Sequence, residues 1–189
     1  MKKIVIFASG SGSNAETITK YFKDKNVEIS LFLTNNPNAY IIERAKILNI
    51  PCKIFNKEDF YSTNAISDIL ININPDLIIL AGFLWLFPEK ILRLFPNRVI
   101  NIHPALLPKY GGKGMYGDKV HKAVIENGEK ESGISIHYVN EKYDEGSIIY
   151  QAKCNIIAND TPETLAQKIH VLEYNYFPEV IEGVLDGKF

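Results

Sequence analysis

Residues 2–14 read KKIVIFASGSGSN, an apolar run of strand length followed at once by two glycines among small polar residues. Other apolar runs of strand length follow at 28–34, 52–55, 76–81 and 98–102. Between them lie amphipathic stretches typical of helices, at about 14–25, 38–49, 58–73 and 88–95. Strands that alternate with helices indicate βαβ units and a parallel sheet that is covered on both faces.

The second half of the chain has a different pattern. Residues 104–117 hold two prolines and four glycines, which predicts an extended loop, and a helix is expected at about 118–127. The runs 133–140 and 147–156 flank EKYDEG, which indicates a pair of antiparallel strands before a last helix from about 161. The sequence therefore predicts an α/β fold of the Rossmann-like, doubly wound kind, with a mostly parallel sheet and antiparallel C-terminal strands. We expect one domain, 1–189.

Composition and charge exclude several classes of protein. The 21 basic and 22 acidic residues are mixed along the chain, so we expect no nucleic-acid partner. The N-terminal apolar run is too short to span a membrane, and Cys52 and Cys154 are isolated as in reduced proteins, so we expect a cytoplasmic protein without membrane contact. The four histidines lack the paired spacings of metal ligands, so no metal is expected.

The glycine loop after the first strand fits the pattern G-x-G-x-x-[GA]. A dinucleotide site would also need an acidic residue about 20 positions further on, where this chain has Thr34 and two asparagines. Backbone N–H groups at a helix N-terminus instead suit the terminal phosphate of a substrate. The alternative is a tight turn capped by Ser13 or Asn14. The candidate phosphate-binding residues are Gly10, Ser11, Gly12, Ser13 and Asn14.

Asn101 and His103 lie on the same side of a strand at its carboxyl end. A histidine passes protons near neutral pH, and an asparagine amide donates to a developing oxyanion, so the pair suits chemistry at a carbonyl carbon. Asp144 in KYDEG is the best candidate to orient the imidazole. No serine or cysteine has the setting of a nucleophile, which favours direct transfer to an amine. The alternative is that His103 is a hydrogen-bonded structural residue. Candidates for supporting roles are Lys57, His121, Ser135 and His137.

Five motifs together resemble the glycinamide ribonucleotide (phosphoribosylglycinamide) formyltransferases, within the superfamily that uses 10-formyltetrahydrofolate. Its most specific element is Asn-x-His-Pro-x-Leu-Leu-Pro, followed about forty residues later by Tyr-Asp-x-Gly. The motifs are SGSGSN, LAGF, NIHPALLPKYGG, SIHYVNEKYDEG and the tail EYNYFPEVIEGVLDGKF.

The resemblance implies transfer of a formyl group from 10-formyltetrahydrofolate, the donor co-substrate, to the amine of glycinamide ribonucleotide in purine biosynthesis. It also implies a nucleotide- and phosphate-binding half, 1–100, and a catalytic and folate-binding half, 101–189. The partners would be these two small molecules, with the protein a monomer or homodimer. The alternatives are a formyltransferase for another amine, a deformylase, and a nucleotide-binding module without catalysis.

The same resemblance implies roles for individual residues. His103 would act as general acid or base, Asn101 would stabilise the oxyanion, and Asp144 would orient His103 and favour its protonated form. Glu173 would contact the ribose of the nucleotide. The implied folate-binding residues are Phe83, Leu84, Trp85, Leu86, Phe87, Asn101, Val139, Asn140, Glu141 and Asp144.

The chain also departs from the family pattern. Trp85 and Lys119 stand where many relatives carry arginine and histidine, which puts the folate tail contact and loop closure in question. The segment YGGKGMYGDKVHKA, 110–123, which contains the glycine-rich loop 110–117, is longer and richer in glycine than in the common bacterial relatives. A cis peptide is expected at Leu107–Pro108.

Overall fold

The computed structural model describes all 189 residues. The chain divides into two compact units, Met1–Ile100 and Asn101–Phe189. One strand is shared by the two units, because β5 (Val99–His103) crosses the boundary.

The first unit is built on a parallel sheet in which β1 is the central strand. β1 pairs with β2 on one side and β4 on the other, and β2 pairs with β3. Four consecutive residues of β1, from Ile4 to Phe7, are fully buried, as expected for a strand covered on both faces. The strands are β1 (Lys2–Phe7), β2 (Val27–Thr34), β3 (Cys52–Ile54) and β4 (Leu77–Leu80).

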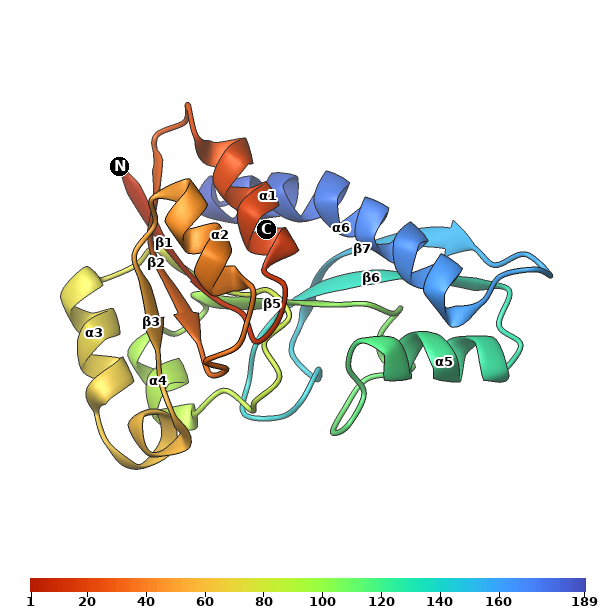
Figure 1. Cartoon of the computed structure of the whole chain (residues 1–189), viewed down its shortest axis with the longest axis horizontal. Helices are drawn as coiled ribbons and strands as arrows, with labels where there is room; N and C mark the ends of the chain where they lie inside the picture. The colour runs from red at the N-terminus through yellow and green to blue at the C-terminus, as the bar shows by residue number, and fades with distance from the viewer. The chain divides into compact units, whose positions relative to one another are not determined.

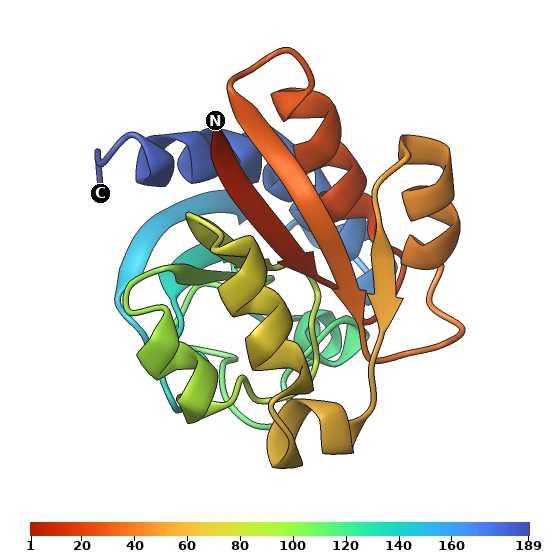
Figure 2. The same ribbon diagram turned by 90° about the vertical axis from the view of Figure 1, so that its left-hand side faces the viewer.

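Helices cover both faces of this sheet. The helices α1 and α2 lie side by side against one face, and α3 lies against the other (Figures 1 and 2). This arrangement confirms the doubly wound fold predicted for the first hundred residues. The helices are α1 (Ser13–Phe22), α2 (Ile41–Leu48), α3 (Ala65–Ile73) and α4 (Glu89–Leu94).

The single helix predicted over 58–73 is wrong. A π-helical turn, η1 (Glu58–Ser62), is followed by a break at Thr63 and Asn64 before α3 begins. Thr63 is extended, and its hydroxyl accepts a hydrogen bond from the N–H of Ala65 at 3.2 Å. Threonine and asparagine offer the backbone such local partners, which favours a helix boundary over a continuous helix.

The second unit contains the predicted antiparallel pair. β6 (Glu131–Tyr138) and β7 (Ile148–Asn155) pair from Glu131 with Asn155 to His137 with Ile148, with a register shift beside His137. The strand order, with β5 shared, is β3-β2-β1-β4-β5-β6-β7. The sheet is thus mostly parallel with antiparallel C-terminal strands, as the sequence predicts.

Two helices complete the second unit, α5 (Asp118–Glu126) and α6 (Pro162–Leu185). α6 begins where the sequence predicts, because Thr161 forms a reciprocal capping pair with Thr164 and Pro162 follows it. Buried residues recur at every fourth position along α6, and the stripe that they form packs on α5, β6 and β7. The residues of that stripe are Leu165, Ile169, Glu173, Phe177 and Ile181.

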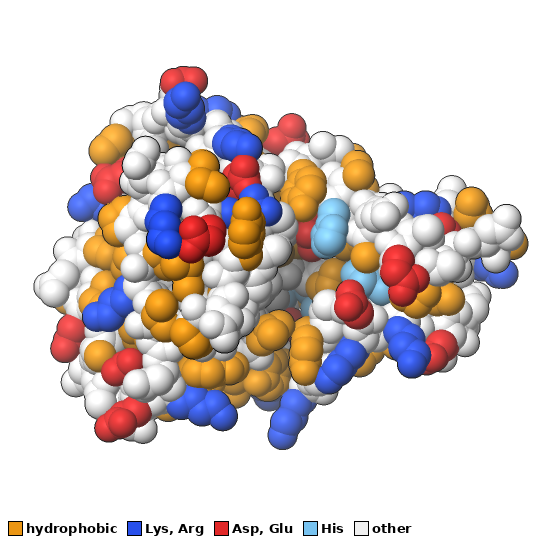
Figure 3. Space-filling model, in the orientation of Figure 1, with side chains coloured by type: hydrophobic (Ala, Val, Ile, Leu, Met, Phe, Trp, Pro, Cys, Tyr) orange, Lys and Arg blue, Asp and Glu red, His pale blue; other side chains and the backbone are white.

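The surface carries no strong charge pattern on the side shown in Figure 3, where basic and acidic side chains are interspersed. None of the helices combines the length and the apolar character needed to cross a bilayer.

Gly12 provides a test of how the first unit is built. Its φ of +73° is left-handed, and an added Cβ would lie 2.7 Å from Cβ of Ile41. We expect Gly12→Ala to lower the free energy of unfolding by about 2–4 kcal/mol, the combined cost of strain and overpacking. Urea unfolding measures this, with Gly10→Ala as the matched control. No atom lies within 4 Å of that added Cβ, so equal losses in both variants would contradict the packing argument.

Candidate functional site

The carboxylate of Asp144 is the centre of a polar cluster in the second unit. Its Oδ2 accepts a hydrogen bond from the N–H of Gly112 at 2.9 Å and lies 3.5 Å from Nδ1 of His103. Its Oδ1 accepts from Nδ2 of Asn101 at 3.4 Å and lies 3.6 Å from Nε2 of His137. The structure therefore brings together the three residues predicted to carry the chemistry and adds a second histidine.

His103 is held at both ring nitrogens. Its Nε2 lies 2.7 Å from the carbonyl oxygen of Tyr110, which can only accept, so Nε2 carries a proton. Nδ1 faces Asp144 and is the nitrogen at which the ring gains or loses a proton. Burial lowers the pKa of His103, and His137 lowers it further, whereas Asp144 and the Tyr110 carbonyl raise it. The pKa of His103 is lowered overall. Burial therefore outweighs Asp144, which was expected to favour the protonated form of the ring.

Asn101 and His137 form a second pair in the cluster. Nδ1 of His137 lies 2.9 Å from the carbonyl of Tyr138 and therefore donates to it. Nε2 of neutral His137 is then free to accept from Nδ2 of Asn101 at 3.0 Å. The sequence named His137 only as a candidate for a supporting role, and the structure places it in the cluster.

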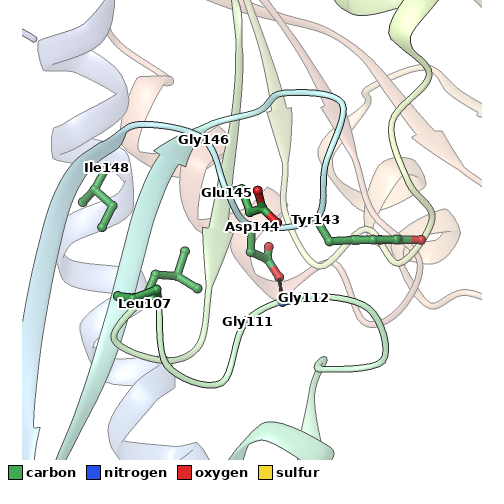
Figure 4. Close-up of a pocket in the computed structure, with 9 residues that line it drawn as sticks. Leu107, Gly111, Gly112, Tyr143, Asp144, Glu145, Gly146 and Ile148 are labelled. Carbon is green, nitrogen blue, oxygen red and sulfur yellow. Dashed lines mark hydrogen bonds between the residues drawn. The ribbon is translucent and has the colours of Figure 1, made fainter.

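Asp144 itself is kept ionised by its neighbours. Burial raises its pKa, but the neighbouring His137 and His103 and the N–H of Gly112 together outweigh burial and lower it. Its backbone is left-handed, with φ of 56°. Tyr143 and Glu145 flank it on the same loop, which turns Asp144 toward Gly112 (Figure 4).

A cavity of about 540 Å³ lies beside this carboxylate. It is framed by the loop after β5 and by the loop between β6 and β7 (Figure 4). A small molecule bound there would meet Asp144 at the cavity wall, and Nδ1 of His103 lies 3.5 Å from that carboxylate. The lining residues are Leu107, Pro108, Gly111, Gly112, Tyr143, Asp144, Glu145, Gly146 and Ile148.

Ser135 supports the loop that carries the cluster. Its buried hydroxyl donates to the carbonyl of Ala105 at 2.7 Å and accepts from the N–H of Leu107 at 2.9 Å. The amide Nε2 of Gln151 also donates to this hydroxyl, at 2.7 Å. Ser135 thus ties β6 to the segment that leaves β5. The peptide bond Leu107–Pro108 in that segment is cis, as predicted.

His121 lies in α5, and its side chain is buried with Nδ1 lacking a hydrogen-bond partner. Burial lowers its pKa. Glu173 lies in the middle of α6 and is also buried. His170 stacks on Tyr174, with ring centroids 6.0 Å apart.

The glycine loop of the first unit is fixed by its carbonyl groups. The carbonyls of Ser9, Gly10 and Ser11 accept from the Asn36 side chain, the Ile41 N–H and the Arg44 side chain respectively. Gly12 is the N-cap of α1, without a side-chain cap bond, so the alternative of a turn capped by Ser13 or Asn14 is wrong. The N–H of Ser13, the first residue of α1, instead donates to the hydroxyl of Ser11 in the loop, at 3.4 Å.

The loop after β4 meets the glycine loop. The N–H of Ser9 donates to the carbonyl of Gly82 at 3.0 Å, and the hydroxyl of Ser9 accepts from the N–H of Leu84 at 3.0 Å. In the order β3-β2-β1-β4 the chain reverses direction of winding between β1 and β4. Ligands of such sheets bind at this switch point, beyond the carboxyl ends of the strands.

Residues 83–87 lie beside an aromatic cluster. Phe83 contacts Phe7 with ring centroids 5.4 Å apart, and Trp85 stacks on Tyr61 at 6.1 Å. Nζ of Lys57 lies 5.8 Å from the Trp85 ring. Phe87 is buried in the core, whereas Leu84 is exposed. In the second unit Val139 and Asn140 are half-buried and Glu141 is exposed.

Sequence reasoning missed two backbone groups of the site, the carbonyl of Tyr110 and the N–H of Gly112. Neither has a side-chain signature, and only the glycine-rich composition of the loop hinted that backbone would approach closely. No group of three or more His, Cys, Asp or Glu side chains in the structure is placed to hold a metal ion.

A doubly wound sheet that carries a histidine, a carboxylate and an amide in contact defines an α/β protein with an acid–base cluster, a set of groups that suits chemistry at a carbonyl carbon. Comparison with known proteins makes the class more specific. The family described as formyl transferase matches residues 2–181. The chain belongs to this family.

Curated relatives carry a more specific name. The chain is 36% identical to the phosphoribosylglycinamide formyltransferase of Haemophilus influenzae, over 100% of this chain and 89% of the relative. It is 42% identical to the chloroplastic enzyme of that name from Arabidopsis thaliana, over 99% of this chain. The chain spans only 66% of the length of that plant relative and 62% of the one from Vigna unguiculata.

Solved structures agree with the fold. The phosphoribosylglycinamide formyltransferase of Anaplasma phagocytophilum superposes with a TM-score of 0.90 at 32% identity, covering 99% of this chain and 88% of that one. The Streptococcus pneumoniae protein of the same name gives 0.86 at 31% identity, covering 97% and 99%.

The buried histidines predict how stability depends on pH. Folded His103 and His121 have pKa values below that of an exposed histidine, near 6.5, so the unfolded chain takes up protons first. The free energy of unfolding should therefore fall as the pH drops from about 6.5 toward 5. Urea unfolding at several pH values measures the slope, and His103→Gln and His121→Gln should each reduce it. If the free energy of unfolding depended on pH equally in the wild type and both variants, the lowered pKa values of His103 and His121 would not be the cause.

Proposed function

We propose that this protein transfers the formyl group of 10-formyltetrahydrofolate to the amine of glycinamide ribonucleotide, in purine biosynthesis. The observation that carries the proposal is the cluster of Asn101, His103 and Asp144 beside a cavity. The names of the curated relatives support this choice of substrate.

In the proposed reaction the amine attacks the formyl carbon, the carbonyl oxygen becomes an oxyanion, and a proton moves from the attacking nitrogen to the departing folate nitrogen. Burial holds His103 neutral, so its Nδ1 is ready to accept that proton. The resulting imidazolium has an acceptor at each nitrogen, Asp144 and the Tyr110 carbonyl. It can then return the proton to the leaving group as a general acid.

Asn101 is the proposed oxyanion donor. Its Nδ2 already contacts Nε2 of His137 at 3.0 Å and Oδ1 of Asp144 at 3.4 Å. The longer of these contacts is the weaker hydrogen bond, so it is the one the oxyanion would replace. His137 would keep the amide oriented while this happens. Oxyanion donors of this kind are worth about 10²–10³ in rate.

We assign nucleotide binding to the glycine loop and the N-terminus of α1. The carbonyls of the loop are engaged, Gly10 is exposed and Gly12 caps the helix without a side-chain bond. Such a helix terminus attracts a phosphate through its N–H groups and its dipole. Glu173 is the proposed partner of the ribose hydroxyls.

We assign folate binding to the segment 83–87, to residues 139–141 and to the cavity next to Asp144. Half-buried aromatic side chains such as Phe83 and Trp85 suit a flat ring system. Lys57, beside Trp85, offers a positive charge for the carboxylates of the folate tail in place of the arginine of many relatives. The folate acts as donor co-substrate, and a cytoplasmic location and a monomer or homodimer remain expectations.

The proposal is tested by following release of tetrahydrofolate from 10-formyltetrahydrofolate with and without glycinamide ribonucleotide. We expect turnover only with the nucleotide. His103→Ala and Asp144→Ala should each lower kcat by about 10²–10⁴-fold, because the proton transfer is lost. His170→Gln, a histidine on the outer part of α6, is the matched control and should keep its turnover.

Other outcomes of the same assay point elsewhere. Turnover without an acceptor would make the protein a deformylase. Turnover only with other amines would mean that the acceptor is not glycinamide ribonucleotide. Near-normal activity of either alanine variant would contradict the proposed chemistry.

Gly10→Ala separates nucleotide binding from stability. The added methyl group enters open space, so folding should be unaffected, but it would obstruct close approach of a phosphate to the loop. We expect the KM for glycinamide ribonucleotide to rise roughly tenfold, with kcat and the KM for folate little changed. Ser30→Ala, which removes a hydroxyl from β2, serves as control. An unchanged KM in Gly10→Ala would rule out the loop as the phosphate site.

A further inference from the structure

Tyr110 connects the surface of the second unit to His103. Its backbone carbonyl accepts the proton of Nε2 of His103 at 2.7 Å. Its hydroxyl donates to Oε1 of Glu129 at 2.9 Å and accepts from Nδ2 of Asn127 at 3.1 Å. Glu129 also pairs with Lys109 at 2.9 Å. We call the contacts of the Tyr110 hydroxyl with Glu129 and Asn127 the tyrosine clamp.

We propose that Tyr110 is a positioning residue, whose clamped hydroxyl fixes the backbone carbonyl that orients the imidazole of His103. For its effect on turnover the proposal rests on the proposed function. For its effect on the imidazole it depends only on the contacts described here.

The backbone of Tyr110 needs such an anchor. Its φ is 58°, in the left-handed region that residues other than glycine rarely adopt. A residue in this region persists only where surrounding contacts determine it. The next residue must remain small, because a Cβ on Gly111 would lie 2.5 Å from Cδ2 of Leu107. Two side chains therefore hold this turn: the tyrosine ring, which is anchored at its far end, and Asp144, which accepts from the N–H of Gly112.

The clamp determines which nitrogen of His103 exchanges protons. With Nε2 bound to the carbonyl, the neutral ring presents Nδ1 toward Asp144, and the protonated ring has both N–H groups satisfied. Two other titratable groups are linked to His103: His137 on β6, which lowers the pKa of His103, and His121 on α5, whose own pKa the charge of His103 lowers in addition to burial. If the carbonyl moved away, the imidazolium would lose one acceptor, and the pKa of His103 would fall further.

Tyr110→Phe removes the hydroxyl and keeps the ring. Nitrogen NMR of the intact chain, labelled in histidine, reads the tautomer and titration of His103 without substrate. We expect the wild type to hold its proton on Nε2, and the variant to show mixed tautomers and a titration at lower pH. In the turnover assay kcat should fall about tenfold, with both KM values within about twofold, because only the positioning of the proton-transfer group is lost.

Matched variants separate the clamp from general destabilisation. Glu129→Gln keeps an acceptor for the hydroxyl and should behave as wild type, whereas Glu129→Ala should reproduce Tyr110→Phe. Tyr150→Phe, whose ring packs on Tyr176 at 5.4 Å, removes a hydroxyl elsewhere in the unit and should change neither readout.

An unchanged His103 tautomer and titration in both Tyr110→Phe and Glu129→Ala would overturn the proposal. Equal losses in Tyr150→Phe would overturn it as well, since the effect would then be general. If the NMR changes occur but the wild type does not turn over glycinamide ribonucleotide, the clamp stands and the proposed function fails.

Discussion

The site depends on one buried carboxylate. Asp144 accepts hydrogen bonds from a backbone N–H and from the Asn101 amide, and it faces both His103 and His137. A buried charge is costly unless such partners surround it, and here they keep the group ionised. Each side chain of the cluster has one of its contacts with this carboxylate, so loss of this single charge would remove a partner from all three.

Two opposing effects set the state of His103. Burial favours the neutral ring, while Asp144 and the Tyr110 carbonyl favour the protonated one. The balance leaves a neutral imidazole whose protonated form is nevertheless well accommodated, which suits a group that must accept a proton and return it. A histidine with only one of these influences would serve as base or as acid, but less readily as both in one turnover.

The glycine loop combines a packing requirement of the fold with a proposed role in phosphate binding. Gly12 is required by its left-handed backbone and by the contact with Ile41, independently of any ligand. Gly10 has open space around it and no such requirement. The glycine pattern that suggests phosphate binding is therefore partly a packing signature, and Gly10 is the position at which the proposed binding role can be tested separately from packing.

The sequence by itself determined the alternation of strands and helices, the antiparallel pair, the start of α6 at Thr161, and the facing of Asn101 and His103, because these follow from local periodicity and capping. The break at Thr63 was missed, since tertiary contacts choose between a capped boundary and a continuous helix. Only the tertiary structure decided that burial would outweigh Asp144 at His103, that His137 would join the cluster, and that the Tyr110 carbonyl and Gly112 N–H would complete it. The physical reason is that burial and these hydrogen bonds arise between segments that are distant in sequence. Backbone N–H and carbonyl groups are also the same in nearly every residue, so the sequence does not mark the ones that will take part.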